Sequence, residues 1–241
     1  MDSMSSPPPY EDILRHSIQI APAGFVDVVI SCAGSGPLYW DHLFDMGLRE
    51  AIAKDPKLEL HFLRELCVGK TGAYSAAIVH SYFRALNSAQ TQRLFSETVL
   101  SDKKYFVHDV FSMATLPSTT PQALALLQVF IAFGLKDQFS QLAIRRHHDV
   151  ETACRFDNLP FLNFLFLQLT PAPVKLLKCV VADPKHGASL TGRLIAAHTI
   201  NLNECEAGPV FQSATSDVQQ YLIALRARLP TREPDRYPKR R

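Results

Sequence analysis

The sequence predicts an α+β fold, with a compact body of strands and flanking helices. Several segments alternate apolar and polar residues at period two, which is typical of half-buried strands. Other segments place apolar residues on one helical face, between a capping residue and a proline or glycine stop. Because the two kinds of segment do not alternate regularly along the chain, we do not expect a doubly wound parallel sheet.

The segments expected to be strands are 16–32, 58–69, 104–113, 174–181 and 190–202. In the first, isoleucine and valine recur at every second position on either side of Pro22 and Gly24, which predicts two strands. The last two segments are joined by the turn-forming run 183–187, so they are expected to form a hairpin.

The expected helices are 43–52, 73–87, 120–133, 136–154 and 216–229. The third has the clearest ends, with Thr120 as N-cap, Pro121 at the first helical position and Gly134 beyond the last turn. Ser216 can cap the final helix, which Pro230 ends. The segment 73–87 is also rich in residues that suit a strand, but its apolar spacing favours a helix.

We divide the chain into a flexible leader at 1–15, a globular body at 16–229 and a disordered basic tail at 230–241. The first nine residues are mostly Ser, Pro and Met, so burial of apolar side chains cannot offset the entropy lost on ordering them. Within the body, the linker 116–120 can separate two halves. A single continuous domain fits normal domain sizes equally well.

The composition argues against several classes of protein. The chain has 241 residues, 47% of them hydrophobic, and 25 basic against 23 acidic side chains leave a net charge of +2, too small to steer the whole molecule onto nucleic acid. Five widely spaced cysteines without a Cys-x-x-Cys pair favour a reducing compartment. The apolar runs 123–133 and 161–169 are shorter than the ~20 residues of a membrane span. We expect a cytosolic chain with no secretory leader and no transmembrane segment.

The leader contains the tetrapeptide Pro7-Pro8-Pro9-Tyr10, which matches the Pro-Pro-x-Tyr ligand of WW domains. Its prolines favour a polyproline II helix that fits an aromatic-lined groove, and the tyrosine ring fills the next pocket. Tyr10 and Ile13 also match a tyrosine-based sorting signal, and a phosphorylated Tyr10 would suit a phosphotyrosine-binding module. The motif predicts a recruiting protein rather than an enzyme.

A Pro-Pro-Pro-Tyr leader followed by an acidic residue and a compact body resembles the matrix proteins of negative-strand RNA viruses, notably rhabdoviruses and filoviruses. The element Trp40-Asp41-His42 is similar to one in vesiculovirus matrix proteins. The resemblance implies that the motif recruits Nedd4-type ubiquitin ligases for budding. It also implies self-association, contact with ribonucleoprotein, and a location in the virion and host cytoplasm at the inner face of a membrane.

Rhabdovirus matrix proteins carry a lysine-rich leader that is missing here, so we assign membrane or ribonucleoprotein contact to other basic residues. In the tail these are Arg232, Arg236, Lys239, Arg240 and Arg241. Near an anionic leaflet each could contribute ~1 kcal/mol, although a solvated tail that only improves solubility, or one that binds an import receptor, explains them equally well. Arg145 and Arg146 form a second basic cluster, which can also complement a helix dipole at the end of 136–154.

His147 and His148 follow that basic cluster, but we recognise no cysteine or carboxylate cluster at ligand spacing beside them, so the sequence predicts no metal site. We assign no catalytic residue, cofactor or small-molecule substrate. Two alternatives stay open: a cellular adaptor that uses the same docking peptide to recruit a Nedd4-type ligase, and an enzyme whose site assembles from residues distant in sequence.

Overall fold

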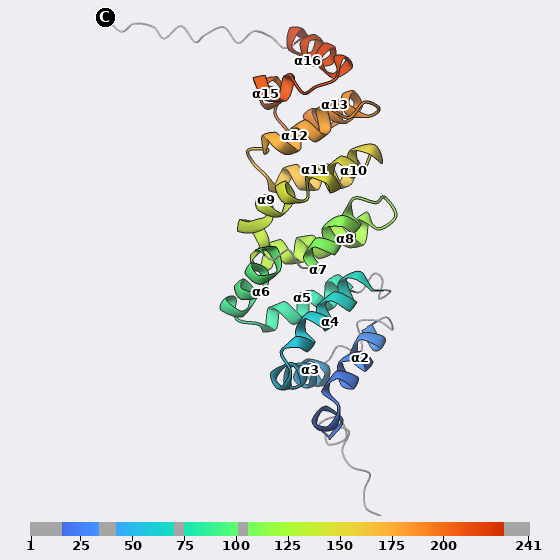
Figure 1. The fold of residues 1–241 in the computed structure, drawn as a ribbon, viewed down its shortest axis with the longest axis vertical. Coiled ribbons are helices and arrows are strands. Elements are labelled where there is room, and N and C mark those ends of the chain that lie inside the picture. The colour runs from blue at the N-terminus through green and yellow to red at the C-terminus, as the bar shows by residue number, and fades with distance from the viewer. Residues whose placement is uncertain (1–15, 34–41, 70–74, 101–105, 229–241) are drawn as a thin grey trace, which may run out of the picture. The chain divides into compact units, whose positions relative to one another are not determined.

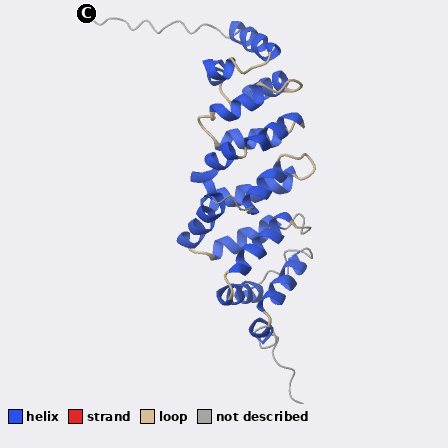
Figure 2. Cartoon of the chain, in the orientation of Figure 1, coloured by secondary structure: helices blue, strands red, loops and turns tan. Residues whose placement is uncertain are grey.

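The computed structural model describes residues 16–33, 42–69, 75–100 and 106–228 of the chain. All the regular secondary structure of these residues is helical, and no strand occurs among them (Figure 2). The predicted α+β fold is therefore wrong, and the described body is all-α. It divides into two compact units, Met1–Leu142 and Ala143–Arg241, which we call the N-terminal and the C-terminal unit. The linker 116–120 lies within the first of them.

The N-terminal unit contains a short helical stretch at 16–20 and then helices that follow one another with short connections (Figure 1). These are α2 (Pro22–Ala33), α3 (His42–Lys54), α4 (Lys57–Val68), α5 (Ser75–Ala85), α6 (Ser88–Leu100), α7 (Phe106–Ala114), α8 (Thr120–Phe130) and the π-helical turn η3 (Ile131–Leu135). Its main contacts join helices that are near in sequence, such as α2 with α4, α4 with α7, and α5 with α8.

The C-terminal unit begins within α9 (Lys136–Arg145), which spans the boundary between the units. The following helices are α10 (His147–Arg155), α11 (Leu159–Gln168), α12 (Val174–Val181), α13 (Gly187–Ala196), α14 (Leu202–Glu206), α15 (Gly208–Phe211) and α16 (Ser216–Arg228). In Figure 1 they lie stacked in chain order, and α12 contacts α10, α13, α14 and α15. In both units, each main contact joins elements no more than three positions apart along the chain.

Phenylalanines form a cluster within the core of the N-terminal unit. Phe83 of α5 is fully buried, and its ring centroid lies 5.5 Å from that of Phe95, 5.9 Å from that of Phe130 and 5.7 Å from that of Phe133. Phe106 of α7 contacts Phe130 edge to face. Because such contacts occur between rings from α5, α6, α7, α8 and the π-helical turn, burial of these aromatic side chains holds the later helices of this unit together.

Every segment predicted as a strand contains helix and no strand where it is described. In α4 the buried residues are Leu58, Phe62, Leu63, Leu66 and Cys67, whose spacing is that of one helical face, whereas Leu60 is 37% exposed. In the 16–32 segment Val28 is 56% exposed, while Val26 and Val29 are buried. Alternation over a few residues therefore misled the prediction, because apolar residues at a helical spacing also occupy several alternate positions.

The remaining predicted strands have the same explanation. The segments 104–113, 174–181 and 190–202 contain α7, α12 and α13, and the last also includes the start of α14. In α12 the buried side chains are Leu176, Leu177, Val180 and Val181, two adjacent pairs one helical turn apart. The run 183–187 does reverse the chain, but it joins two helices and not two strands. Tertiary packing thus overrides the β propensity of the valines.

Four of the five predicted helices are confirmed, with changes at their ends, and the fifth is divided in two. Thr119 and not Thr120 occupies the N-cap position of α8, and Gly134 adopts φ 126° inside the π-helical turn. Only glycine adopts such a backbone without strain. The single helix expected at 136–154 is two helices, which are separated at Arg146, and Thr215 rather than Ser216 accepts the capping bond from Val218 in α16.

Asn158 caps α11 and offers a test of the local structure. Its Oδ1 accepts a hydrogen bond from the Phe161 backbone N–H at 3.3 Å, and the residue is 3% exposed. Asn158→Ala should lower the free energy of unfolding by about 0.5–2 kcal/mol, because the Phe161 backbone N–H loses the Asn158 Oδ1 as its acceptor. Urea titration followed by circular dichroism measures this. Asn158→Ser keeps an acceptor, so an equal loss in both variants would contradict the capping role.

Candidate functional site

Most of the side chains that the sequence singled out lie outside the described residues. These are Pro7, Pro8, Pro9, Tyr10, Ile13, Arg232, Arg236, Lys239, Arg240 and Arg241. Trp40 and Asp41 also lie outside them, and His42 is the first residue of α3. Only Arg145 and Arg146 of the predicted site residues are described.

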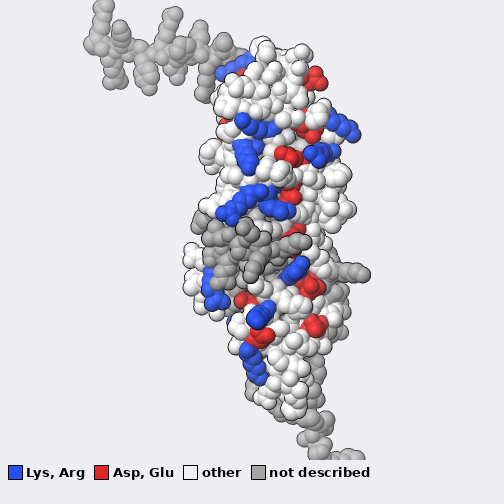
Figure 3. Space-filling view, viewed as in Figure 1, with Lys and Arg blue, Asp and Glu red and all other residues white. Residues whose placement is uncertain are grey.

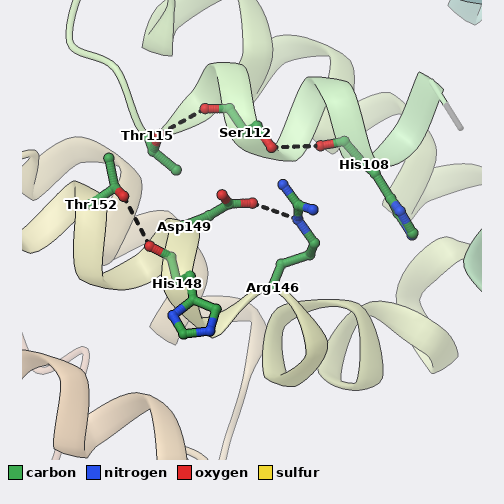
Figure 4. Close-up of polar contacts among 7 residues, drawn as sticks. All are labelled: His108, Ser112, Thr115, Arg146, His148, Asp149 and Thr152. Carbon is green, nitrogen blue, oxygen red and sulfur yellow. Dashed lines mark hydrogen bonds and ion pairs between the residues drawn. The ribbon is translucent and has the colours of Figure 1, made fainter. Parts of the chain in front are cut away.

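Arg145 ends α9, and Arg146 forms the break before α10. The Arg146 Nε donates to the Asp149 Oδ2 at 2.6 Å (Figure 4). Asp149 therefore offsets the charge of Arg146, while Arg145 lies at the carboxyl end of α9, as expected for a cation that complements the helix dipole. His147 and His148 do not share that position, because they are the first two residues of α10.

The threonine and serine hydroxyls shown in Figure 4 bond to their own helices. Thr152 donates to the His148 carbonyl at 2.9 Å in the C-terminal unit. In the N-terminal unit, Ser112 donates to the His108 carbonyl at 3.1 Å, and Thr115 donates to the Ser112 carbonyl at 2.7 Å. Such bonds to the preceding turn are usual for these residues in helices. We therefore assign these hydroxyls a structural role.

His147, His148 and Glu151 form a cluster in the first turns of α10, which we call the His-Glu cluster. One potential ligand atom from each residue lies within 4.8 Å of the others. The His148 Nδ1 is 3.2 Å from the Glu151 Oε2, and the two imidazole rings lie 3.9 Å apart at their centroids. Glu151 is not among the residues predicted from the sequence, although it follows the histidines by four and three residues, the spacing that places side chains on one face of a helix.

A cavity of about 510 Å³ in the C-terminal unit adjoins this cluster, since His147 and Glu151 both line it. Its walls also include the basic residues Arg155, Lys175 and Lys178. The Asp183 carboxylate borders it but accepts the backbone N–H groups of the next turn, Lys185 at 3.1 Å and His186 at 2.7 Å. The cavity thus joins imidazole and carboxylate groups with three basic side chains.

Cys179 also lines the cavity, but it is not an activated nucleophile. Its Sγ points to the backbone, with the Lys175 carbonyl at 3.3 Å and the His147 carbonyl at 3.8 Å. Burial, with a smaller contribution from Glu151, raises the pKa of the Cys179 thiol to about 11. Nucleophilic catalysis requires the thiolate, which is scarce near neutral pH at such a pKa. The neighbouring Cys154 is more deeply buried, and its pKa is raised further.

A second cavity of about 470 Å³ lies elsewhere in the C-terminal unit, with His198, Asn201 and Glu204 among its lining residues. Asn201 and Glu204 are engaged in the capping box of α14: the Glu204 Oε2 accepts from the Asn201 backbone N–H at 3.0 Å, and the Asn201 Oδ1 accepts from the Asn203 backbone N–H at 3.0 Å. Their polar atoms therefore stabilise a helix end. The His-Glu cluster and its cavity form the stronger candidate site.

Comparison with known proteins gives no identification: no family model, no curated protein and no solved structure matches the chain. No helix among the described residues is long and apolar enough to cross a membrane. The sequence motif and the described helices are therefore the features that bear on function.

Proposed function

We propose that this chain is a recruiting protein: Pro7-Pro8-Pro9-Tyr10 binds the WW domain of a Nedd4-type ubiquitin ligase, and the helical body binds the partner to which the ligase is brought. The observation that carries the proposal is the tetrapeptide itself, in which the two prolines and the tyrosine stand at the spacing that a WW groove reads. No part of this proposal requires catalysis by the chain.

The fold supports a binding role for the body. In each unit the helices contact elements close to them in sequence, as in proteins built from stacked helices. Such proteins present extended surfaces to partners. Both signs of charge are interspersed over the face seen in Figure 3, so a partner would be recognised by local groups rather than by one strong field.

Capture by an isolated Nedd4-type WW domain tests the proposal. Tyr10→Ala should abolish capture of the full chain, because the terminal aromatic pocket is left empty, and Pro7→Ala should weaken it strongly. Pro9→Ala is a matched control, because Pro9 occupies the variable position and its loss removes only stiffness. Ile13→Ala should leave capture unchanged, since Ile13 belongs only to the sorting signal. Equal capture of all four variants and the parent chain would refute the docking role.

A second candidate places the same recruitment under a membrane, as in the viral matrix proteins that the leader resembles. The features that favour it are the leader motif and the basic residues 232–241, both of them in the sequence. We propose that such a chain would self-associate and contact anionic lipid or ribonucleoprotein during particle release. The expected α+β body, which was one of the features behind the resemblance, does not support it, because the described body is all-α.

Expression of the full chain in cells separates the two settings. A matrix-like protein should pellet with membranes and release particles into the medium, and Tyr10→Ala should reduce that release without altering the helical content. An adaptor should remain in the soluble fraction and release no particles, while still binding the ligase through Tyr10.

A further inference from the structure

We propose that the His-Glu cluster, His147, His148 and Glu151, binds a Zn²⁺ ion at the start of α10. Two imidazoles and one carboxylate are the donor set of open zinc sites, in which solvent or a ligand completes the coordination. The cluster is built by one helix, so it does not depend on distant loops.

The geometry requires only a modest adjustment. At the tetrahedral angle, ligand atoms about 2.0–2.2 Å from a shared Zn²⁺ ion lie ~3.3–3.6 Å apart. Those of the cluster lie within 4.8 Å of one another, so they must move closer by about 1 Å. The His148 side chain is 77% exposed, so its ring is free to rotate toward the other two groups. The Glu151 carboxylate already approaches it at 3.2 Å.

His147 supplies an independent observation. Its Nδ1 is buried and has no hydrogen-bond partner among the described residues, although unpaired buried polar atoms are costly. Most buried polar atoms in folded proteins are satisfied, and a Zn²⁺ ion bound at the His147 Nδ1 would provide the partner that the described residues do not. Packing alone therefore does not explain a histidine at position 147, because an apolar side chain there would leave no polar atom buried and unpaired.

Some charges around the cluster disfavour binding of a cation, and others favour it. The amino end of a helix carries partial positive charge, which disfavours a cation. Glu151 supplies the opposing carboxylate, whereas Asp149 is engaged by Arg146. Because His147 and Glu151 line the cavity together with Arg155, Lys175 and Lys178, an ion between them would border a basic chamber. The open coordination position would therefore favour water, hydroxide or an anionic group.

The competing explanation is that His148 and Glu151 form an ordinary exposed pair on a helix, a contact worth little in solution. That explanation predicts no zinc affinity beyond what any surface histidine provides. Calorimetric titration of the metal-free full chain with Zn²⁺ distinguishes the two. We expect one ion per chain at this cluster.

His148→Ala and Glu151→Gln should each weaken that binding by at least about tenfold, the loss that even an outer partner of a metal ligand produces. Both positions are partly exposed, and circular dichroism confirms that the variants fold. His198→Asn is the matched control: it removes an exposed imidazole from the same unit, and asparagine tolerates the left-handed backbone at φ 56°. No Zn²⁺ binding, or binding unchanged by both cluster variants, would overturn the proposal.

Discussion

Phe83→Ala should lower the free energy of unfolding by about 3–5 kcal/mol, the cost of removing a large aromatic side chain from a packed core. Phe83 is fully buried and contacts rings from three other elements, α6, α8 and the π-helical turn. The substitution leaves a cavity that these helices cannot fill without moving. Urea titration followed by circular dichroism, or the midpoint of thermal unfolding, measures the loss.

The same substitution at an exposed phenylalanine provides the control. Phe156 is 54% exposed, so Phe156→Ala should change the free energy of unfolding by no more than about 0.5 kcal/mol. Phe83→Leu should lie between the two, because it retains part of the buried volume. A Phe83→Ala variant as stable as Phe156→Ala would show that the aromatic core described here does not hold the N-terminal unit together.

Alkaline pH should destabilise the protein strongly through its buried thiols. Burial raises the pKa of Cys67 and Cys154 far above the ordinary value of 9.0, that of Cys205 to about 12 and that of Cys179 to about 11. Well below pH 9 each thiol is protonated in both the folded and the unfolded chain. As the pH rises above 9, the unfolded chain releases these protons while the folded chain retains them, which favours unfolding.

The buried Cys67 alone should lower the free energy of unfolding by ~1 kcal/mol between pH 9 and pH 10, with a slope that approaches ~1.4 kcal/mol per pH unit at higher pH. Unfolding midpoints in urea at pH 8, 9 and 10 measure the slope, and Cys67→Ala isolates this contribution from the other groups that titrate there. The variant starts from a lower stability but should decline less steeply with pH. Parallel slopes for the parent chain and the variant would contradict a buried, protonated thiol at this position.

The helices that could be predicted from the sequence are those with local signals. Pro121 marks the start of α8 and Gly134 lies in the π-helical turn that follows it. The 3.6-residue spacing in α3 and α16 extends over enough turns to be distinct from alternation. The segments of α4, α7 and α12 are short, rich in valine, leucine and phenylalanine, and compatible with both periods. Their conformation is decided by the neighbours against which they pack.

The candidate site divides in the same way. The basic run at Arg145 and Arg146 and the histidines after it are evident in the sequence, but only the break at Arg146 separates them into the end of one helix and the start of the next. Because α10 begins directly after this break, His147, His148 and Glu151 all lie on one helix, at a spacing that brings their side chains together. The cavity could not be predicted, because its walls come from α10, α12 and later residues that are distant in sequence.

The sequence by itself determined which apolar side chains are available for the core. It also determined the Pro-Pro-Pro-Tyr peptide, because a linear docking motif depends on adjacent residues alone. It also determined the caps and stops of several helices, which are local interactions. Only the tertiary structure decided that the remaining apolar segments are helices and that His147, Glu151 and Lys178 surround one cavity. The physical reason is that burial depends on which surfaces meet, and short apolar segments carry too little local preference to fix that in advance.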